Sequence, residues 1–140
     1  MSELAFFDTN VLVYMHDTRY AYKREVALRL FRRHLYSKTL VISTQVLQEF
    51  YVVVSRKLEN VRSGQARALT EEYARLNVLT IRSEHVLKAI DLRSRYQISF
   101  WDGLILAGAE AAQASLVLSE DLGHGQTYDG VRVENPFVTH

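Results

Sequence analysis

The chain of 140 residues contains no cysteine, one proline and six glycines. Without cysteine it can form neither a disulfide framework nor a thiolate metal site, which fits a reducing compartment. Because prolines and glycines are few, and no low-complexity tract or internal repeat is present, we expect no linker and no second domain. The sequence therefore predicts one domain over residues 1–140.

Long apolar segments are also missing. The first ten residues, MSELAFFDTN, have no basic region and no apolar run long enough for a signal peptide or a membrane span. We therefore expect a cytoplasmic protein that does not associate with a membrane. Hydrophobic residues make up 48% of the chain, which is enough to fill the core of one ordinary domain.

Charges of the two signs are nearly balanced, with a formal net charge of +1. Their distribution is uneven, because residues 19–38 hold seven lysines and arginines against a single acid, Glu25. A local basic stretch can attract phosphate, but a solvated helix face has the same composition. Both interpretations stay open, also for a second basic group formed by Arg56, Lys57, Arg62 and Arg67.

The hydrophobic pattern alternates between strand and helix periods. Short apolar runs predict strands at residues 4–7, 39–43, 78–81, 116–118 and 131–133. Helical spacing predicts helices at residues 10–16, 22–36, 45–58, 65–76, 83–96 and 100–114. We expect Ser83 to be the N-cap of its helix. This alternation is typical of an α/β fold with a central, mainly parallel sheet of about five strands flanked by helices.

Polar side chains follow two of the predicted strands. Asp8 comes directly after the first strand, and Ser119, Glu120 and Asp121 come directly after the fourth. The carboxyl ends of parallel strands meet at one edge of a sheet, and a crevice opens there when the strand order reverses. We therefore expect these residues to lie beside one another at such a crevice.

Four acidic residues border apolar segments, where an uncompensated carboxylate is costly to desolvate. They are Asp8, Glu49, Asp102 and Asp121. Each one alone has a purely structural explanation.

The first two explanations concern a helix start and a helix border. Asp8 can cap the helix that follows the first strand. Glu49 lies roughly 40° from Val53 on a helical wheel, at the border of the apolar arc. There it could simply pair with Arg56 or Gln45.

The other two explanations concern a cap and a turn. Asp102 directly precedes residues 103–114, in which Glu110 is the only charged residue. The helix in this segment is therefore expected to be buried. Ser99 and Asp102 have the spacing of a capping box. Asp121 precedes two glycines and could belong to a turn.

Taken together, the four acids suggest a shared site. Carboxylates that converge at one sheet edge repel each other unless they are protonated or bind a cation. Oxygen ligands without cysteine suit Mg²⁺ or Mn²⁺, which can acidify a bound water and stabilise a leaving oxygen. The pattern predicts hydrolysis of a phosphodiester.

Four segments carry a family resemblance: FFDTNVLVY, STQVLQEFYVVVSRK, ISFWDGLILAGA, and LVLSEDLGHGQ followed by VENPF. In this order and spacing they resemble the motifs of PIN-domain ribonucleases, of the kind that serve as toxins in VapBC toxin–antitoxin pairs. The resemblance covers essentially the whole chain. It places the acidic site at Asp8, Glu49, Asp102 and Asp121, with Thr9, Asn10 and Ser119 as supporting polar residues.

The resemblance implies an Mg²⁺- or Mn²⁺-dependent endoribonuclease that leaves 5′-phosphate and 3′-hydroxyl ends on RNA. Asp8 and Asp102 are expected to hold one ion, and Glu49 to hold it or to orient the attacking water. Asp121 would act beside them or at a second ion. The resemblance also implies a small VapB-type antitoxin that inserts a segment across the site, and a homodimer.

Three local alternatives stay open. Glu120 could replace Asp121 as the fourth acid, although the Ser-x-Asp spacing favours Asp121. His124 could contact phosphate or be an exposed loop residue. Several aromatic residues could stack on RNA bases, line an antitoxin groove or fill the core: Tyr14, Tyr20, Tyr22 and Tyr51.

Two other functions are weaker. The D-x-N sequence at Asp8 faintly resembles the D-x-D motif of haloacid-dehalogenase-like phosphatases, but Asn10 lacks the second acid, and Glu49 and Asp102 would have no role. A catalytically silent PIN fold that binds RNA or protein would not require all four acids.

Overall fold

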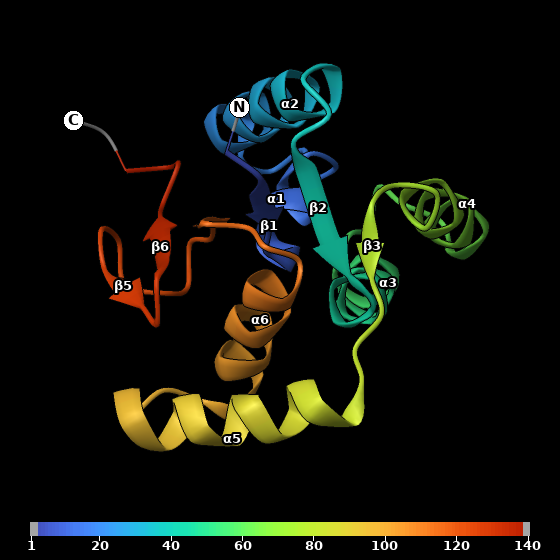
Figure 1. The fold of residues 1–140 in the computed structure, drawn as a ribbon. Helices are drawn as coiled ribbons and strands as arrows, with labels where there is room; N and C mark the ends of the chain where they lie inside the picture. The colour runs from blue at the N-terminus through green and yellow to red at the C-terminus, as the bar shows by residue number, and fades with distance from the viewer. Residues whose placement is uncertain (1–2, 139–140) are drawn as a thin grey trace.

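The computed structural model describes residues 3–138 and contains, in that range, six strands and six helices in one sheet-centred domain. The strands are β1 (Ala5–Phe7), β2 (Leu40–Ser43), β3 (Val78–Leu79), β4 (Leu116–Leu118), β5 (Thr127–Tyr128) and β6 (Val131–Glu134). The helices are α1 (Thr9–Tyr14), α2 (Ala21–Tyr36), α3 (Thr44–Lys57), α4 (Ser63–Tyr73), α5 (Ser83–Tyr96) and α6 (Phe100–Ala111). Figure 1 shows their arrangement.

The strand order in the sheet is β3-β2-β1-β4-β6-β5. All neighbouring strands are parallel except β5 and β6, which confirms the predicted α/β architecture. The chain steps outward from β1 to β3 and then returns to the other side of β1 with β4. The strand order therefore reverses between β1 and β4, where the sequence predicts a crevice.

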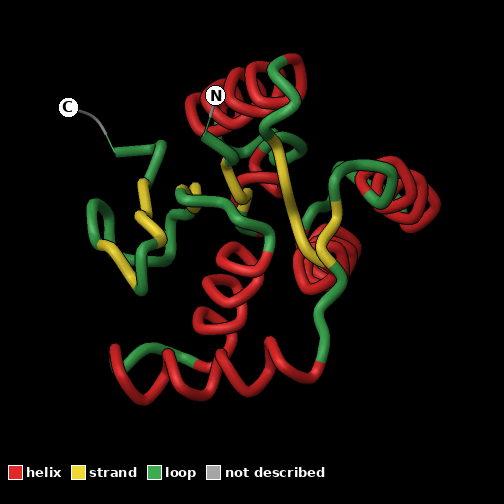
Figure 2. The backbone as a smooth tube through the Cα atoms, viewed as in Figure 1, coloured by secondary structure: helices red, strands yellow, loops and turns green. Residues whose placement is uncertain are grey.

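The three central strands are buried along their whole length, as expected for parallel strands covered on both faces. Right-handed crossovers that step in opposite directions lie on opposite faces of a sheet, so the α1–α4 connections and the α5–α6 connection cover different faces. Figure 2 shows the short strands surrounded by these helices. Within residues 3–138, no helix is long and apolar enough to span a membrane.

Helix α6 is buried from Gly103 to Ala109, as its apolar sequence predicts. In Figure 1 it begins beside α5, which crosses its start, and runs toward the sheet. The two helices approach so closely that a Cβ atom at Gly103 would lie 2.6 Å from the carbonyl oxygen of Ala89. This contact fixes the start of α6, where Asp102 lies.

The sheet has one strand more than the five predicted. The additional strand, β5, forms a hairpin with β6, and the two residues between them, Asp129 and Gly130, have φ angles of 47° and 86°. Positive φ at both central residues is typical of a type I′ turn, for which Asp-Gly is a favoured sequence. The Asp-Gly turn sequence is visible in TYDGV, but β5 has only two residues, which is too short for a recognisable strand pattern.

The predicted helices are all present, and their ends differ by a few residues. The prediction that Ser83 is an N-cap is wrong, because Ser83 is the first residue of α5 and Arg82 is the N-cap. The side chain of His85 satisfies this helix start instead, since its Nδ1 accepts a hydrogen bond from the Arg82 N–H at 2.9 Å. Helix α6 ends at Ala111 rather than at residue 114.

Candidate active site

Asp8 lies at the carboxyl end of β1, directly beside β4. Phe7 pairs with Leu118, and the Asp8 N–H continues the ladder by donating to the Leu118 carbonyl at 3.0 Å. The Asp8 side chain is 5% exposed. Its Oδ1 accepts from the Thr9 N–H at 2.7 Å, so the expected helix cap is present, and its Oδ2 accepts from the Ser119 hydroxyl at 2.6 Å.

The surroundings of Asp8 oppose its ionisation. Burial raises the pKa of its carboxyl to about 7, and the negative charges of Asp121 and Glu49 act in the same direction. The hydrogen bonds from Ser119 and Thr9 favour the carboxylate but do not reverse the effect of burial. Asp8 is therefore a buried acid that no basic side chain among residues 3–138 pairs with.

Ser119 joins two of the acids through one hydroxyl group. Its Oγ donates to Asp8 and accepts from the Asp121 N–H at 3.1 Å. Ser119 is fully buried, and its own N–H donates to the Glu134 carbonyl of the neighbouring strand β6 at 3.1 Å. The sheet thus fixes the hydroxyl that orients the Asp8 carboxylate.

Thr9 connects the start of α1 with α3. Its Oγ1 donates to Glu49 Oε1 at 2.9 Å. The structure contradicts the two pairings considered for Glu49, because among residues 3–138 this side chain is bonded to neither Arg56 nor Gln45. The half-buried Glu49 is instead held toward the end of β1.

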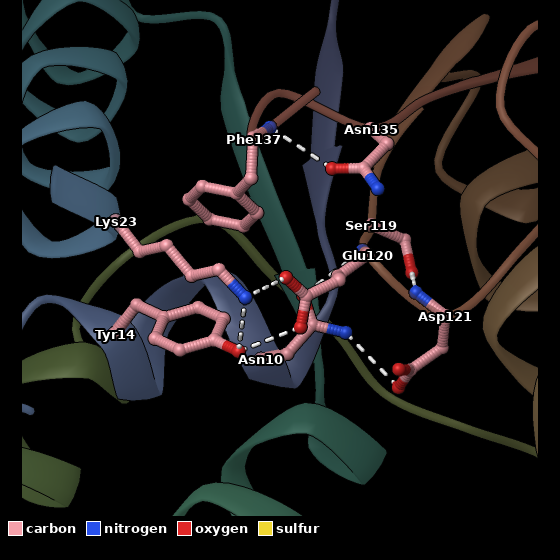
Figure 3. A network of polar contacts seen from close by, with 8 residues as sticks. All are labelled: Asn10, Tyr14, Lys23, Ser119, Glu120, Asp121, Asn135 and Phe137. Atoms are coloured by element: carbon pink, nitrogen blue, oxygen red, sulfur yellow. Dashed lines mark hydrogen bonds and ion pairs between the residues drawn. The ribbon is translucent and has the colours of Figure 1, made fainter. Parts of the chain in front are cut away.

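Asn10 connects α1 with the loop after β4. Its Nδ2 donates to Asp121 Oδ2 at 3.1 Å, and its Oδ1 accepts from the Glu120 N–H at 3.2 Å. Figure 3 shows the Asp121 side chain pointing toward Asn10, with the Ser119 hydroxyl near its backbone. These bonds fix the orientation of both acids after β4.

Glu120 and Asp121 point in different directions (Figure 3). The Glu120 carboxylate accepts from the Tyr14 hydroxyl at 2.6 Å and from Lys23 Nζ at 2.6 Å. Lys23 also lies 4.9 Å from the centre of the Tyr14 ring. Glu120 is therefore neutralised in an ion pair, whereas Asp121 has only an amide as its hydrogen-bond donor.

Asp102 lies in the first turn of α6. The predicted cap is present, because the Ser99 hydroxyl accepts from the Asp102 N–H at 3.0 Å. Burial raises the pKa of the Asp102 carboxyl, and the charge of Asp121 adds to this effect. Because Ser99 caps the helix through the backbone N–H of Asp102, the Asp102 carboxylate remains available for another role.

One cavity of about 650 Å³ unites these side chains. Its polar lining includes six residues singled out in the sequence: Asp8, Thr9, Asn10, Glu49, Asp102 and Asp121. Ser119 does not line it and acts from behind Asp8. Neither Glu120 nor His124 is part of the lining. His124 is exposed and accepts a hydrogen bond from the Asn135 N–H.

The cavity contains residues that sequence reasoning missed. Trp101, which is 61% exposed, Gln45 and Gln48 line it, and so does Arg19, which the sequence placed only in a basic stretch. Trp101 could have been noticed as the neighbour of Asp102. Of the four tyrosines considered, Tyr14 and Tyr20 line the cavity, whereas Tyr22 and Tyr51 do not.

The donor atoms suit a hard divalent cation, although the side chains are not arranged as a finished site. In the part of the chain that the structure describes, no three histidine or acidic side chains are grouped closely enough to hold one ion. The four acids nevertheless supply only oxygen ligands, and no ion pair to a basic side chain is found for any of them among residues 3–138. Such a set of carboxylates fits Mg²⁺ or Mn²⁺.

Comparison with solved structures identifies the same fold in several proteins. A toxin–antitoxin complex from Klebsiella pneumoniae has a chain 19% identical in sequence, with a TM-score of 0.69 over 95% of this chain and 98% of that chain. DNA-bound VapBC from Salmonella typhimurium gives 19% identity and a TM-score of 0.68, covering 96% of this chain and 99% of that one.

A third similar structure is VapC20 from Mycobacterium tuberculosis, described as a Sarcin-Ricin loop cleaving toxin. It is 18% identical, with a TM-score of 0.64 over 84% of this chain and 89% of that chain. No curated protein sequence gives a significant match. The family model of the PIN domain matches residues 5–129, a range that includes the four predicted acids. With this match and the observed sheet topology, the chain belongs to the PIN domain family.

Proposed function

We propose that the protein is a metal-dependent endoribonuclease and the toxin of a VapBC-type toxin–antitoxin pair. The observation that carries this proposal is the cavity in which Asp8, Glu49, Asp102 and Asp121 have no basic partner among the described residues, whereas the fifth acid of its lining, Asp17, is paired with Arg19. A divalent cation would offset both the burial that raises the pKa of Asp8 and the smaller contribution from the charges of Asp121 and Glu49.

Asp8 and Asp102 would hold the ion, with Glu49 and Asp121 beside them. When bound, Mg²⁺ or Mn²⁺ supplies a water of lowered pKa and positive charge for the leaving oxygen of a phosphodiester. The remaining chemistry belongs to the chain itself. Ser119 and the Thr9 N–H fix the two oxygens of Asp8, so that this carboxylate meets an ion in one orientation.

Glu49 is the side chain best placed to orient or deprotonate the attacking water. Its Oε1 accepts a hydrogen bond from Thr9, and its Oε2 makes no hydrogen bond within residues 3–138, so Oε2 would be available to a water in the cavity that Glu49 lines. Asn10 holds Asp121 in the same way. In this proposal cleavage by water leaves a 5′-phosphate and a 3′-hydroxyl on RNA.

The partners in this proposal follow from the structural neighbours. The similar proteins from Klebsiella pneumoniae and Salmonella typhimurium were solved in toxin–antitoxin assemblies. We therefore propose a small antitoxin of the VapB type as the partner of this chain. A homodimer and a cytoplasmic location remain part of the proposal.

A cleavage assay tests the proposed activity. Purified protein is incubated with RNA in EDTA, in Mg²⁺ and in Mn²⁺, and the ends of the products are sequenced. We expect cleavage only with a divalent ion. Asp8→Asn should reduce the rate roughly a hundredfold or more, because it removes a negative ligand while retaining the size and capping ability of the side chain.

The matched control is Asp129→Asn, the same change outside the cavity. Circular dichroism establishes that both variants are folded. Cleavage by Asp8→Asn at the wild-type rate would show the mechanism to be wrong. RNA that binds without being cut under any metal condition would instead support the silent PIN fold.

A further inference from the structure

Arg19 is the one basic side chain in the lining of the cavity, within the residues that the structure describes. It lies in the loop between α1 and α2, on the side of the cavity that also includes Tyr20. Lys23, the next basic residue along the chain, is engaged with Glu120 and does not line the cavity. A polyanion that enters this acidic cavity therefore meets one cation.

The guanidinium of Arg19 is held in place by Asp17. Arg19 Nε donates to Asp17 Oδ1 at 2.9 Å and Nη2 donates to Oδ2 at 2.8 Å, which is a two-point contact. The Arg19 N–H adds a third bond to Oδ1 at 3.1 Å. Asp17 itself is only 2% exposed, so the anchor is part of the folded core rather than a mobile surface side chain.

The opposite side of the guanidinium remains accessible. The Arg19 side chain is 58% exposed, and its Nη1 group makes no hydrogen bond within residues 3–138. Its Cζ lies 5.3 Å from the centre of the Tyr20 ring, which restricts the plane of the group further. The result is a pre-oriented donor with free N–H bonds at the edge of the cavity.

A purely structural role would explain less of this geometry. A surface arginine that only stabilises a turn would not need a buried carboxylate as its partner. It also would not need to line an acidic cavity. A planar guanidinium with free donors is, in contrast, well suited to the oxygens of a phosphodiester.

We propose that Arg19 binds a backbone phosphate of the RNA strand in the cavity, and that Asp17 is its positioning residue. This inference rests on the proposed function, because it assigns a substrate contact to the same site. It also gives Tyr20 a defined role, which is to support the guanidinium from its other face.

The test measures binding separately from cleavage. Each variant is made in the Asp8→Asn background, and its affinity for a short single-stranded RNA is measured by fluorescence anisotropy over a series of salt concentrations. Arg19→Gln should weaken binding about five- to tenfold and reduce the salt slope of log K by about 0.7, the value for one phosphate contact on a single strand. Arg132→Gln is the matched control, since Arg132 is exposed on β6, outside the cavity and outside both basic groups.

Two further variants separate charge from orientation. Arg19→Lys keeps the charge and should retain the salt slope but not the full affinity, because an ammonium lacks the planar fork. Asp17→Asn should also retain the slope and lose affinity, since the guanidinium remains but is no longer held at two points. In the active protein Arg19→Gln should raise KM and leave kcat within about twofold.

An unchanged affinity and salt slope in Arg19→Gln would overturn the inference, and the pair would then be a turn staple or a contact for a protein partner. Absence of any salt-dependent RNA binding would overturn it as well. Failure of the proposed function is detected in a different experiment, the cleavage assay, in which the protein with Asp8 intact would show no metal-dependent cleavage. The two failures are therefore distinguishable.

Discussion

Asp8 and Asp129 are the same side chain in opposite electrostatic surroundings. Asp129, in the turn between β5 and β6, accepts hydrogen bonds from Lys88, Arg95 and Tyr96 of α5, and these hold its pKa well below the ordinary range. Asp8 accepts bonds only from neutral groups, and burial raises its pKa to about 7.

The comparison separates structural from functional carboxylates. Asp129 attaches the β5–β6 hairpin to α5, and its charge is balanced by the protein. The charge of Asp8 is not balanced by any side chain described, although four more acids line the same cavity, of which only Asp17 is paired with a basic side chain. A fold retains such an unfavourable group when something outside the chain supplies the missing charge.

The largest expected effect on stability is that of Asp8→Asn in the metal-free protein at pH 8. A carboxyl with a raised pKa in the folded chain contributes stability that is complete below its unfolded pKa of 3.8 and is lost as the pH rises through about 7. Asn removes this penalty, so the free energy of unfolding should increase by up to about 4 kcal/mol at pH 8.

The gain should vanish as the pH falls toward 4, which urea unfolding in EDTA at several pH values can measure. A variant that unfolds more easily than the wild type at pH 8 would show that Asp8 mainly stabilises the helix start. In that case the contrast with Asp129 would lose its basis.

The second prediction concerns the neighbouring acids after β4. Asp121→Asn should lower the cleavage rate roughly a hundredfold, because a carboxylate facing the cavity is removed. Glu120→Gln should change the rate less than about threefold, since the Glu120 carboxylate is engaged with Lys23 and Tyr14 and does not line the cavity. Initial rates on one RNA substrate measure both, and the reverse ranking would exchange the two residues in the site.

The smallest effect is expected for Asp129→Asn. Losing charge-assisted bonds at a partly exposed site should lower the free energy of unfolding by about 1 kcal/mol. The cleavage rate should stay close to that of the wild type, because the hairpin turn is not part of the cavity. Thermal unfolding together with the RNA assay measures this; a rate loss as large as that of Asp8→Asn would contradict a purely structural role.

Most of the architecture could be predicted because buried parallel strands appear as short apolar runs between amphipathic helices. The edge of the sheet at Asp8 and Ser119 followed from the same pattern. Strand β5 could not be predicted in this way, since two residues are too few to show an alternation of apolar and polar side chains. The Asp-Gly pair indicates only the turn that follows it. Ser83 was misplaced by one position because the His85 side chain satisfies that helix start.

The candidate site could be predicted in composition but not in orientation. Acids next to apolar segments are visible in a sequence, and all four line the cavity. Which of two adjacent acids faces it depends on the opposite directions that Glu120 and Asp121 take after β4 (Figure 3). Arg19 reaches the cavity only through the tertiary fold, so no local pattern identifies it, whereas Trp101 is adjacent to Asp102 in the sequence.

The central claim is that a divalent ion supplies the positive charge that the cavity acids lack. Crystals of the protein soaked in millimolar Mn²⁺ and measured at a wavelength with strong manganese anomalous scattering test it directly. We predict an anomalous peak between the Asp8 and Asp102 carboxylates in the wild type, and none in Asp8→Asn. A wild-type cavity without a peak at this concentration would contradict the account.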